Sequence, residues 1–449
     1  MTGSGAGRPT PEKRTFLDDL GLAYLLELLK NKLNGKASAV HKHALTDIEG
    51  AQDVGNRTTR LVIGTSTSGW TAIDCDYLCD GTEDNVEINA AIEALPANGG
   101  EIVLLDGTYK LAQEIKLSKP NTTLMGNGKN TILERTFAKT GQTSGLINVT
   151  GNYSTVKDIT INGASGSTES GVGVFVSGMA VNVTNIRVFN CAYDGIRVTG
   201  QYCKITHNTL DGCQDGIYAG GANAIVEGNH CILNTGIGIY IFGQTCSVFG
   251  NMCEANATGI AVASSNNTIT GNICQDNTGK DFYIGGTGNV VEANTAHNAD
   301  TGVPGIEFMS SAKNTIIGHN RISNGMITVK GKEIEWVDPP MNANTEYRTT
   351  QRWMGKPVYT KLVAFTPKSG TDNVVQINYA DEEIHVLRST ACFQDGNGAC
   401  YIFPYGSRVA KVNSNSDKNG GSLIYITIDG MTSNDTTGTF YFHVWYVKN

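Results

Sequence analysis

The sequence repeats itself between about Val181 and Trp336, and this repeat limits the possible folds more than any other feature. One asparagine recurs after 21, 22, 21, 22 and 26 residues, at Asn208, Asn229, Asn251, Asn272, Asn294 and Asn320. A second column follows the same period, at Gly195-Ile196, Gly216-Ile217, Gly238-Ile239, Gly259-Ile260, Asp281-Phe282 and Gly305-Ile306. Regular periods of this length are typical of solenoids, in which each repeat is one structural unit.

Each repeat contains short runs of branched apolar residues, separated by glycine and asparagine. This pattern predicts strands, because a helical repeat would need longer periodic segments without such interruptions. We therefore expect each repeat to be one coil of a parallel β-helix, with coils about 4.8 Å apart. The asparagines are expected at bends with left-handed backbone, bonded from coil to coil. A stack of small apolar side chains should point inward at Leu210, Cys231, Cys253, Cys274, Ala296 and Ile322.

Composition limits the partners. The 449 residues include 54 glycines and carry a net charge of −8, so the basic surface that nucleic-acid binding requires is missing. The absence of a run of about eighteen apolar residues predicts no membrane span. The first residues lack the apolar core of a signal peptide, and the eleven cysteines form no small disulfide framework. We therefore expect synthesis and folding in a cytoplasm.

The N-terminal region, residues 1–60, combines an apolar helical stripe with a histidine pair. Apolar residues keep helical spacing from Phe16 to Leu33, which predicts packing on copies of itself, on a larger partner or on the chain's own β-helix. His41 and His43 would point the same way on an extended chain. One chain supplies too few ligands for a closed metal site, whereas three chains supply six imidazoles. The alternatives are a threefold metal clasp and two solvated linker histidines.

Two stretches resemble known phage proteins. Residues 20–27 and 41–48 together resemble the N-terminal attachment segment of tail-fibre proteins from Gram-positive prophages. Residues 62–92 resemble the opening of tail-spike β-helices of the pectate-lyase-like superfamily. The resemblance implies a homotrimer that attaches to a baseplate or tail protein through residues 14–50. It also implies a structural transition metal, Fe or Zn, held by His41 and His43 on the trimer axis, and no required cofactor.

The remaining chain divides at Pro339-Pro340. Residues 61–338 are expected to form the β-helix, and a helix capped by Asp80 or Thr82 and running to Leu95 should cover its open first coil. The apolar face of this helix would consist of Val86, Ile88, Ala91, Ile92 and Leu95. Cys75 and Cys79 are then thiols buried under the helix rather than metal ligands.

Residues 339–449 carry longer alternating strands, which predict an antiparallel β-sandwich. This region resembles the small C-terminal head domains of tail proteins, which trimerise and contact the host. Cys392 and Cys400 would face each other across a hairpin, although a cytosolic origin argues against a disulfide.

Acidic and aromatic residues of the coils are the candidate site residues. Asp194 and Asp215 occupy one column on adjacent coils, and Asp276 and Asp281 lie close together in another coil. Glycoside hydrolysis requires two carboxylates about 5–10 Å apart, but Asp before Gly is also ordinary turn composition. The catalytic residues are therefore left open. Aromatic side chains would stack on sugar rings or simply cover the sheet, at Tyr193, Tyr218, Tyr240 and Phe242.

Two functions of different classes follow. The first is a tail spike or fibre of a phage or related particle, made in the bacterial cytoplasm and carried on the virion tail. It would bind a bacterial surface polysaccharide or receptor without cleaving it. The second is a glycan depolymerase, a hydrolase or lyase acting on capsule or wall polysaccharide. The attachment segment, the histidine pair and the head favour the first, and the missing signal peptide disfavours a secreted, free-standing lyase.

Overall fold

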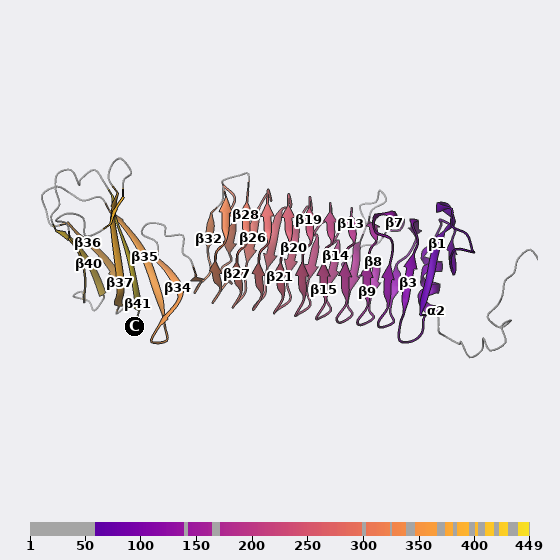
Figure 1. Ribbon diagram of the computed structural model, residues 1–449, viewed down its shortest axis with the longest axis horizontal. Coiled ribbons are helices and arrows are strands. Elements are labelled where there is room, and N and C mark those ends of the chain that lie inside the picture. The colour runs from indigo at the N-terminus through magenta and orange to yellow at the C-terminus, as the bar shows by residue number, and fades with distance from the viewer. Residues whose placement is uncertain are drawn as a thin grey trace, which may run out of the picture. The chain divides into compact units, whose positions relative to one another are not determined.

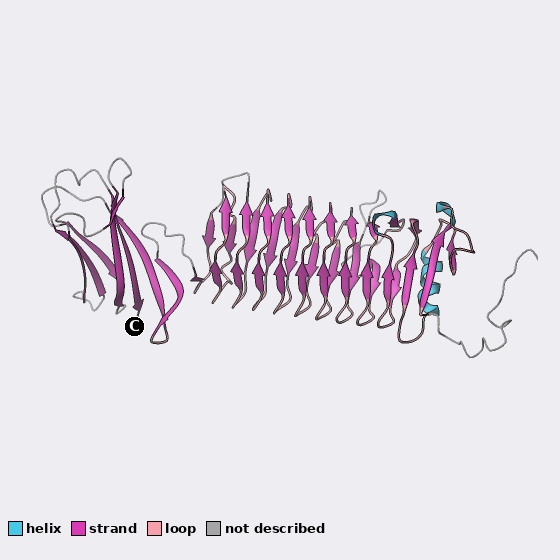
Figure 2. Cartoon of the chain, viewed as in Figure 1, coloured by secondary structure: helices cyan, strands magenta, loops and turns pink. Residues whose placement is uncertain are grey.

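Three parallel sheets wind around one common core (Figures 1 and 2). The structure, a computed structural model, describes residues 59–138, 142–163, 171–298, 302–323, 326–337 and 346–365, and the strands that follow them. Nearly every coil contributes one strand to each sheet, and strands of successive coils pair in parallel. The parallel β-helix predicted from the repeat is therefore confirmed.

We name the three sheets A, B and C. Sheet A contains β1 (Arg60–Thr65), β2 (Tyr77–Cys79), β3 (Glu101–Leu104), β6 (Thr123–Met125), β9 (Thr155–Lys157), β12 (Asn182–Thr184), β15 (Lys204–Thr206), β18 (Ile225–Glu227), β21 (Ser247–Phe249), β24 (Thr268–Thr270), β27 (Val290–Glu292), β30 (Ile316–Gly318) and β33 (Glu335–Trp336). Sheet B contains β4 (Gly107–Leu111), β7 (Thr131–Arg135), β10 (Thr160–Asn162), β13 (Arg187–Phe189), β16 (Thr209–Asp211), β19 (His230–Ile232), β22 (Met252–Glu254), β25 (Ile273–Gln275), β28 (Thr295–His297) and β31 (Arg321–Ser323). Sheet C contains β5 (Ile115–Leu117), β8 (Gly145–Val149), β11 (Val172–Val176), β14 (Ile196–Val198), β17 (Ile217–Ala219), β20 (Ile237–Ile241), β23 (Thr258–Val262), β26 (Lys280–Ile284), β29 (Ile306–Phe308) and β32 (Ile327–Val329). Short 3-10 turns lie at Ser66–Ser68 and Gly128–Asn130.

The core consists of aligned apolar columns. The predicted inward stack on sheet B is buried at Leu210, Cys231, Cys253, Cys274 and Ala296, and Ile322 is partly buried against it. On sheet C the inward column of the repeats is fully buried; it consists of isoleucines, with Phe282 in place of one of them. The cysteines of the stack are free thiols that fill the core, as the pattern indicates.

The predicted asparagine ladder lies at the bend between sheets A and B. The side chain of Asn229 donates to Oδ1 of Asn251 at 3.0 Å, and the backbone N–H of Asn229 donates to the same oxygen at 2.9 Å. The same pair of bonds recurs between successive members from Asn208 to Asn320. Each buried amide is therefore satisfied by the next coil.

The conformation expected for these asparagines is wrong in one respect. Positive φ is found at the residue before each ladder asparagine, at His207, Gly228, Gly250, Gly271, Ala293 and His319. The left-handed residue turns the chain, and the asparagine that follows points inward to form the ladder. The bend thus needs a tolerant backbone at one position and an amide at the next.

Two further asparagine ladders are present that the repeat pattern does not predict. Between sheets B and C, the side chain of Asn234 donates to Asn256 at 2.8 Å, and that of Asn256 donates to Asn277 at 3.1 Å. Between sheets C and A, the backbone N–H of Asn267 donates to Oδ1 of Asn289 at 2.8 Å. Each of the three bends therefore has a buried amide column over part of its length.

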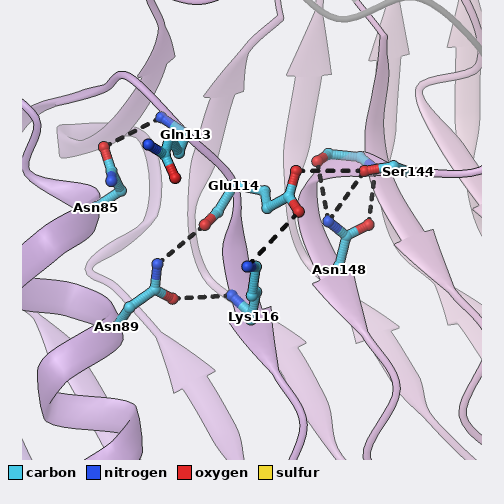
Figure 3. Close-up of polar contacts among 8 residues, drawn as sticks. Asn85, Asn89, Gln113, Glu114, Lys116, Ser144 and Asn148 are labelled. Carbon is cyan, nitrogen blue, oxygen red and sulfur yellow. Dashed lines mark hydrogen bonds and ion pairs between the residues drawn. The ribbon is translucent and has the colours of Figure 1, made fainter.

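A single helix, α2 (Asn85–Ala94), covers the first coil, as predicted. Ile88, Ala91 and Ile92 are fully buried in the core. Figure 3 shows how its polar side chains replace a neighbouring coil. Oδ1 of Asn85 accepts the N–H groups of Ala112 and Gln113, and Asn89 bonds to the backbone of Glu114 and Lys116. The helix thereby satisfies backbone groups that have no preceding strand.

The predicted start of this helix is wrong. The residue before the first turn is Asp84, whose carboxylate accepts the N–H groups of Gly81 and Lys110 instead of capping the helix. Asp80 bonds to Thr82 within the preceding turn. Val86, expected on the apolar face, is 55% exposed.

The last coil is continued by antiparallel strands. β33 pairs in parallel with β34 (Glu346–Trp353), which forms a hairpin with β35 (Lys356–Phe365). Oε1 of Glu335 accepts bonds from Arg348 at 2.9 Å and Arg352 at 2.6 Å. This hairpin and its ion pairs protect the strand edge at the C-terminal end of the β-helix.

The other C-terminal strands form antiparallel pairs: β36 (Asn373–Tyr379), β37 (Ile384–Gln394), β38 (Cys400–Ile402), β39 (Val409–Ser416), β40 (Ser422–Asp429) and β41 (Thr439–Lys448). β41 joins β35 to β37, and β36, β40 and β39 form a separate sheet. Cys392 lies opposite Ile402, and Cys400 lies opposite Gln394. The two cysteines are therefore not directly opposite each other, in contrast to the prediction. The sandwich, the head function and the boundary at 338/339 stay predictions. In the part of the chain that the structure describes, no helix has the length and apolar character required to cross a membrane.

The asparagine ladder gives a stability prediction. Replacing Asn251 with alanine leaves buried donors of Asn229 and the carbonyl of Val226 without their partners. We expect Asn251→Ala to lower the free energy of unfolding by about 2 kcal/mol or more, because each unsatisfied buried polar group costs about 1–3 kcal/mol. Thermal unfolding followed by circular dichroism measures the effect. The matched control is Asn320→Ala at the half-buried end of the ladder, and an equal loss in both variants would contradict a cost that arises from burial.

Candidate functional site

The candidate site is the outer surface of sheet C, which we call the sheet C face. One outward residue per strand lies in register with those of the neighbouring coils. This column consists of Lys116, Asn148, Phe175, Arg197, Tyr218, Tyr240, Ala261, Tyr283, Glu307 and Thr328. The residues on either side of each point inward, so this column and the adjoining bends form the accessible face.

Three aromatic rings gather in the middle of the face. Tyr218 and Tyr240 meet edge to face with ring centroids 5.5 Å apart, and Tyr218 and Phe242 are stacked at 6.3 Å. Phe242 is 53% exposed, although the rings of Tyr218 and Tyr240 lie next to it. The cluster therefore presents aromatic surface to solvent.

A glycine makes room for one of these rings. A Cβ atom at Gly220 would lie 2.6 Å from Cε1 of Tyr218, whereas the equivalent position of the next coil is Phe242. Gly220 thus allows the Tyr218 ring to lie over its own strand. The arrangement of the cluster depends on the small residue as well as on the rings.

Arg197 joins the aromatic cluster to a buried acid. Its guanidinium carbon lies 3.8 Å above the ring centroid of Tyr218, and Nη1 donates to Oδ2 of Asp194 at 2.6 Å. The side chain of Asp194 is only 1% exposed. Burial raises the pKa of Asp194 to about 6, although the bond from Arg197 opposes this shift. The ion pair orients Arg197 on the tyrosine.

The other predicted site residues occupy different positions. Asp215 lies in the same column as Asp194 on the next coil, and its Oδ1 accepts the N–H of Ile237 at 2.7 Å. Burial raises the pKa of Asp215 as well. Tyr193 lies in the bend before β14, outside the column that contains Tyr218 and Tyr240. The structure thus brings Asp194, Asp215, Tyr218 and Tyr240 to one face.

Further along the face a second ionic group surrounds Tyr283. Glu307, whose side chain is 6% exposed, accepts Lys330 at 2.5 Å and lies 3.8 Å from Lys280. The ammonium group of Lys280 lies 4.8 Å from the centroid of the Tyr283 ring. The pattern repeats that of Arg197, since a cation lies over a tyrosine and pairs with a buried carboxylate.

The end of the face near α2 is polar. Lys116 lies 3.9 Å from Glu114, and Asn148 donates to the hydroxyl of Ser144 at 3.2 Å (Figure 3). Aromatic character therefore begins at Phe175 and extends toward the later coils.

Comparison with known proteins bears on these coils. Residues 144–280 and 203–334 match the family model of the right handed beta helix region. The coils form a right-handed β-helix. No curated protein matches the sequence.

Solved structures of similar fold include phage proteins and polysaccharide enzymes. ORF18 of Geobacillus virus E2 is 14% identical over 87% of this chain and 80% of its own, with a TM-score of 0.47. The enzymatically active domain of tailspike protein 2 of bacteriophage CBA120 is 9% identical over 81% and 77%, with a TM-score of 0.48. An alginate lyase from Paenibacillus sp. is 14% identical over 61% and 98%, with a TM-score of 0.48. Identities this low do not distinguish adhesion from cleavage.

The cap of the right-handed β-helix contains one cluster of metal-ligating atoms. Atoms of Cys79, Asp84 and Glu87 lie within 4.8 Å of one another. Cys79 is buried under α2 as expected, whereas Cys75 is only half-buried. Burial raises the pKa of all three groups of the cluster, and both oxygens of Asp84 already accept backbone N–H groups. The packing of α2 against the first coil therefore accounts for the closeness of these three side chains, and no cation is needed to explain it. His41 and His43 lie outside the described residues.

Sequence reasoning missed the roles of Arg197 and Gly220. Arg197 lies three residues after Asp194 and one coil before the outward-pointing Tyr218. This relation can be recognised only when the register of the coils is known.

Asp281 replaces the glycine of its column and is fully buried. Asn277 donates to its Oδ1 at 2.7 Å, because the next residue of this ladder, Asn298, donates to the backbone of Asn277 instead of accepting from its side chain. Among the described residues, Oδ2 of Asp281 has no partner. Asp281 is thus the terminus of an amide ladder and not part of an accessible acid pair with Asp276.

This burial predicts a pH dependence of stability. Burial raises the pKa of Asp281 from 3.8 to about 7. Between these values the unfolded chain loses this proton first, so the contribution of Asp281 is favourable at low pH and is lost as the pH rises toward about 7. Asp281→Asn cannot ionise, and its Tm should exceed that of the parent by an amount that grows over this range.

Thermal unfolding at about pH 5 and about pH 8 checks the sign. The control is Asp276→Asn, which changes an exposed carboxylate of the same coil. A Tm difference for Asp281→Asn that shrinks with rising pH would show that the carboxylate is stabilised in the fold.

Proposed function

We propose that the chain is a tail-spike or tail-fibre protein that binds a bacterial surface polysaccharide along the sheet C face. The observation that carries this proposal is the cluster of the exposed Phe242 and the partly exposed Tyr218 and Tyr240, with Arg197 fixed beside it. A β-helix could cover this strand column with small polar residues, as it does at Asn148 and Thr328. Retaining exposed aromatic rings in one region is typical of a binding surface.

The geometry of the face suits a linear glycan. Pyranose rings have apolar C–H faces that pack on aromatic rings, while their hydroxyl groups need polar partners. Coils about 4.8 Å apart place successive side chains at nearly the advance of one sugar ring along a chain. A polysaccharide lying parallel to the helix axis would therefore meet Phe175, Arg197, Tyr218 and Tyr240 in order.

The tail context rests on the N-terminal resemblance. We propose attachment to a phage baseplate or tail protein through residues 14–50, assembly as a homotrimer, and a structural Fe or Zn at His41 and His43. The protein would be made in the cytoplasm of the bacterial host, of Gram-positive type, and would act outside it on the virion tail. The C-terminal strands would form a head that adds a second contact with the host.

A depolymerase is the second candidate. Asp194 and Asp215 lie one coil apart, and burial raises the pKa of both, which a general acid requires. Carboxylates on adjacent coils fall near the separation of about 5 Å found in retaining glycosidases. The near-complete burial of Asp194 and its bond to Arg197 favour an orienting role instead.

Single substitutions of the tyrosines test the binding face. Tyr218→Ala and Tyr240→Ala should each weaken binding of a host surface polysaccharide by about tenfold, which corresponds to about 1.4 kcal/mol for a lost stacking contact. Isothermal calorimetry on the full chain measures the change. Gly220→Ala should also weaken binding, because its Cβ displaces the Tyr218 ring without removing it.

The matched control is Tyr153→Ala, which removes a tyrosine that is 58% exposed just before β9 of sheet A, outside the aromatic cluster. Equal losses in Tyr153→Ala and Tyr218→Ala would contradict the assignment of the face. If the parent releases new reducing or unsaturated ends during the same incubation and Asp215→Asn does not, the depolymerase is the correct function.

The histidine pair has a separate test. Light scattering should give a native mass three times the 47.8 kDa of one chain. Elemental analysis should find about one transition-metal ion per trimer, because six imidazoles complete one site. His41→Ala with His43→Ala should abolish this metal, whereas His297→Ala, on β28, should retain it. A native mass of one chain would contradict both the clasp and the trimer.

A further inference from the structure

The cations on or directly after the strands of sheet C are paired with carboxylates of the protein. Lys116 lies within 4 Å of Glu114, Arg197 of Asp194, and both Lys280 and Lys330 of Glu307. The carboxylates of Asp194 and Glu307 are 1% and 6% exposed, so they lie beneath the cations that they bind. A ligand approaching these strands therefore meets ion pairs.

The fourth carboxylate makes the balance complete. Asp215 lies at the position equivalent to Asp194 on the next coil, where the charge of Arg197 still acts on it, so the four cations are accompanied by four carboxylates: Glu114, Asp194, Asp215 and Glu307. The whole chain carries a charge of −8, which adds a weak repulsion toward anions.

A fifth cation, Arg135 on β7, lies beneath the bend that leads to sheet C. Its side chain is 1% exposed, and it donates to the carbonyl of Val172 at 2.7 Å and lies over Phe137. Burial lowers the pKa of Arg135. A group so enclosed cannot bind the carboxylate of a long polymer. Two exposed lysines, Lys313 and Lys332, lie in the bends from sheet C to sheet A beyond the aromatic cluster, so the charge pairing described here concerns the strands of sheet C.

We infer that the sheet C face selects an uncharged polysaccharide and discriminates against chains that carry carboxylate, sulfate or phosphate groups. This inference rests on the proposed glycan-binding function. Binding an anionic sugar would require breaking an ion pair with a buried carboxylate, and the freed carboxylate would then lie close to the ligand. Hydroxyl groups avoid this penalty, because a guanidinium has five N–H donors and Arg197 needs only some of them for Asp194.

The first test compares ligands. The full chain is titrated with purified bacterial surface polysaccharides sorted by whether the repeat unit is neutral or anionic. We expect neutral polymers to bind at least about tenfold more tightly than anionic polymers of similar length, because each anionic ligand loses the equivalent of about one ion pair. Tighter binding of the anionic group would overturn the inference.

Ionic strength gives an independent measure. Between about 0.01 M and about 1 M salt the Debye length falls from about 30 Å to about 3 Å, so binding driven by charge weakens steeply. Affinity for the neutral ligand should change by less than about twofold over this range. A large loss of affinity with salt would show that unpaired cations hold the ligand.

A charge variant tests the cause of the selectivity. Glu307→Gln removes the carboxylate that pairs with Lys280 and Lys330, so the ratio of anionic to neutral affinity should rise several-fold at low salt. The matched control is Glu254→Gln on β22 of sheet B, which removes an acid 3.7 Å from Nε2 of His230 and should leave this ratio unchanged. An unchanged ratio in Glu307→Gln would contradict the inference.

The outcomes separate the two proposals. If no polysaccharide binds, or if binding survives Tyr218→Ala and Tyr240→Ala together, the proposed function itself is wrong. If anionic polymers bind and the tyrosine variants abolish that binding, the glycan-binding face stands and only the selectivity is wrong.

Discussion

The buried amide ladders are the constraint on which the rest of the structure depends. A ladder asparagine both donates to and accepts from its counterparts one coil away, so a coil shifted by one residue would leave several buried polar groups without partners. The apolar core columns act in the same direction, because a shift by one residue would turn every inward side chain to solvent. With the register fixed at the bends, outward side chains of successive coils must align. The aromatic column of the sheet C face is a consequence of that alignment.

The same dependence explains the ends of the coils. Where an amide ladder or a sheet ends, its last buried donors and acceptors have no partner in a neighbouring coil. The chain satisfies these groups in a different way at each place. At the first coil the side chains of Asn85 and Asn89 bond to backbone groups that no strand precedes. At the last coil a hairpin continues sheet A, held by the ion pairs of Glu335. Within the helix, Asn277 ends a ladder on Asp281, and the result is a buried carboxyl group with one unpartnered oxygen.

Periodicity made the fold predictable, and its limits explain what was missed. The columns of Asn229 and Ile217 recur in nearly every coil, so spacing alone predicts coils, core and ladder. The start of α2 was wrong because Asp84, expected to be helical, bonds instead to Gly81 and to Lys110 on β4, a contact between distant residues that no local pattern contains. The site was only partly accessible to sequence reasoning for a similar reason. Tyr218 and Tyr240 belong to a column and could be named, whereas Arg197 and Gly220 act through contacts with Tyr218 that depend on side-chain direction.

Asp194 shows why a raised pKa does not by itself identify a catalytic acid. Burial is the largest cause of the shift to about 6, and the same burial leaves the carboxyl group 1% exposed and bonded to Arg197. A general acid must reach the glycosidic oxygen, and here the buried carboxyl group is bonded to Arg197, which itself lies over Tyr218. Partial protonation would instead weaken the hold on Arg197 and alter the position of the guanidinium over the tyrosine. The physical effect of this group therefore acts through the positions of Arg197 and Tyr218 on the sheet C face.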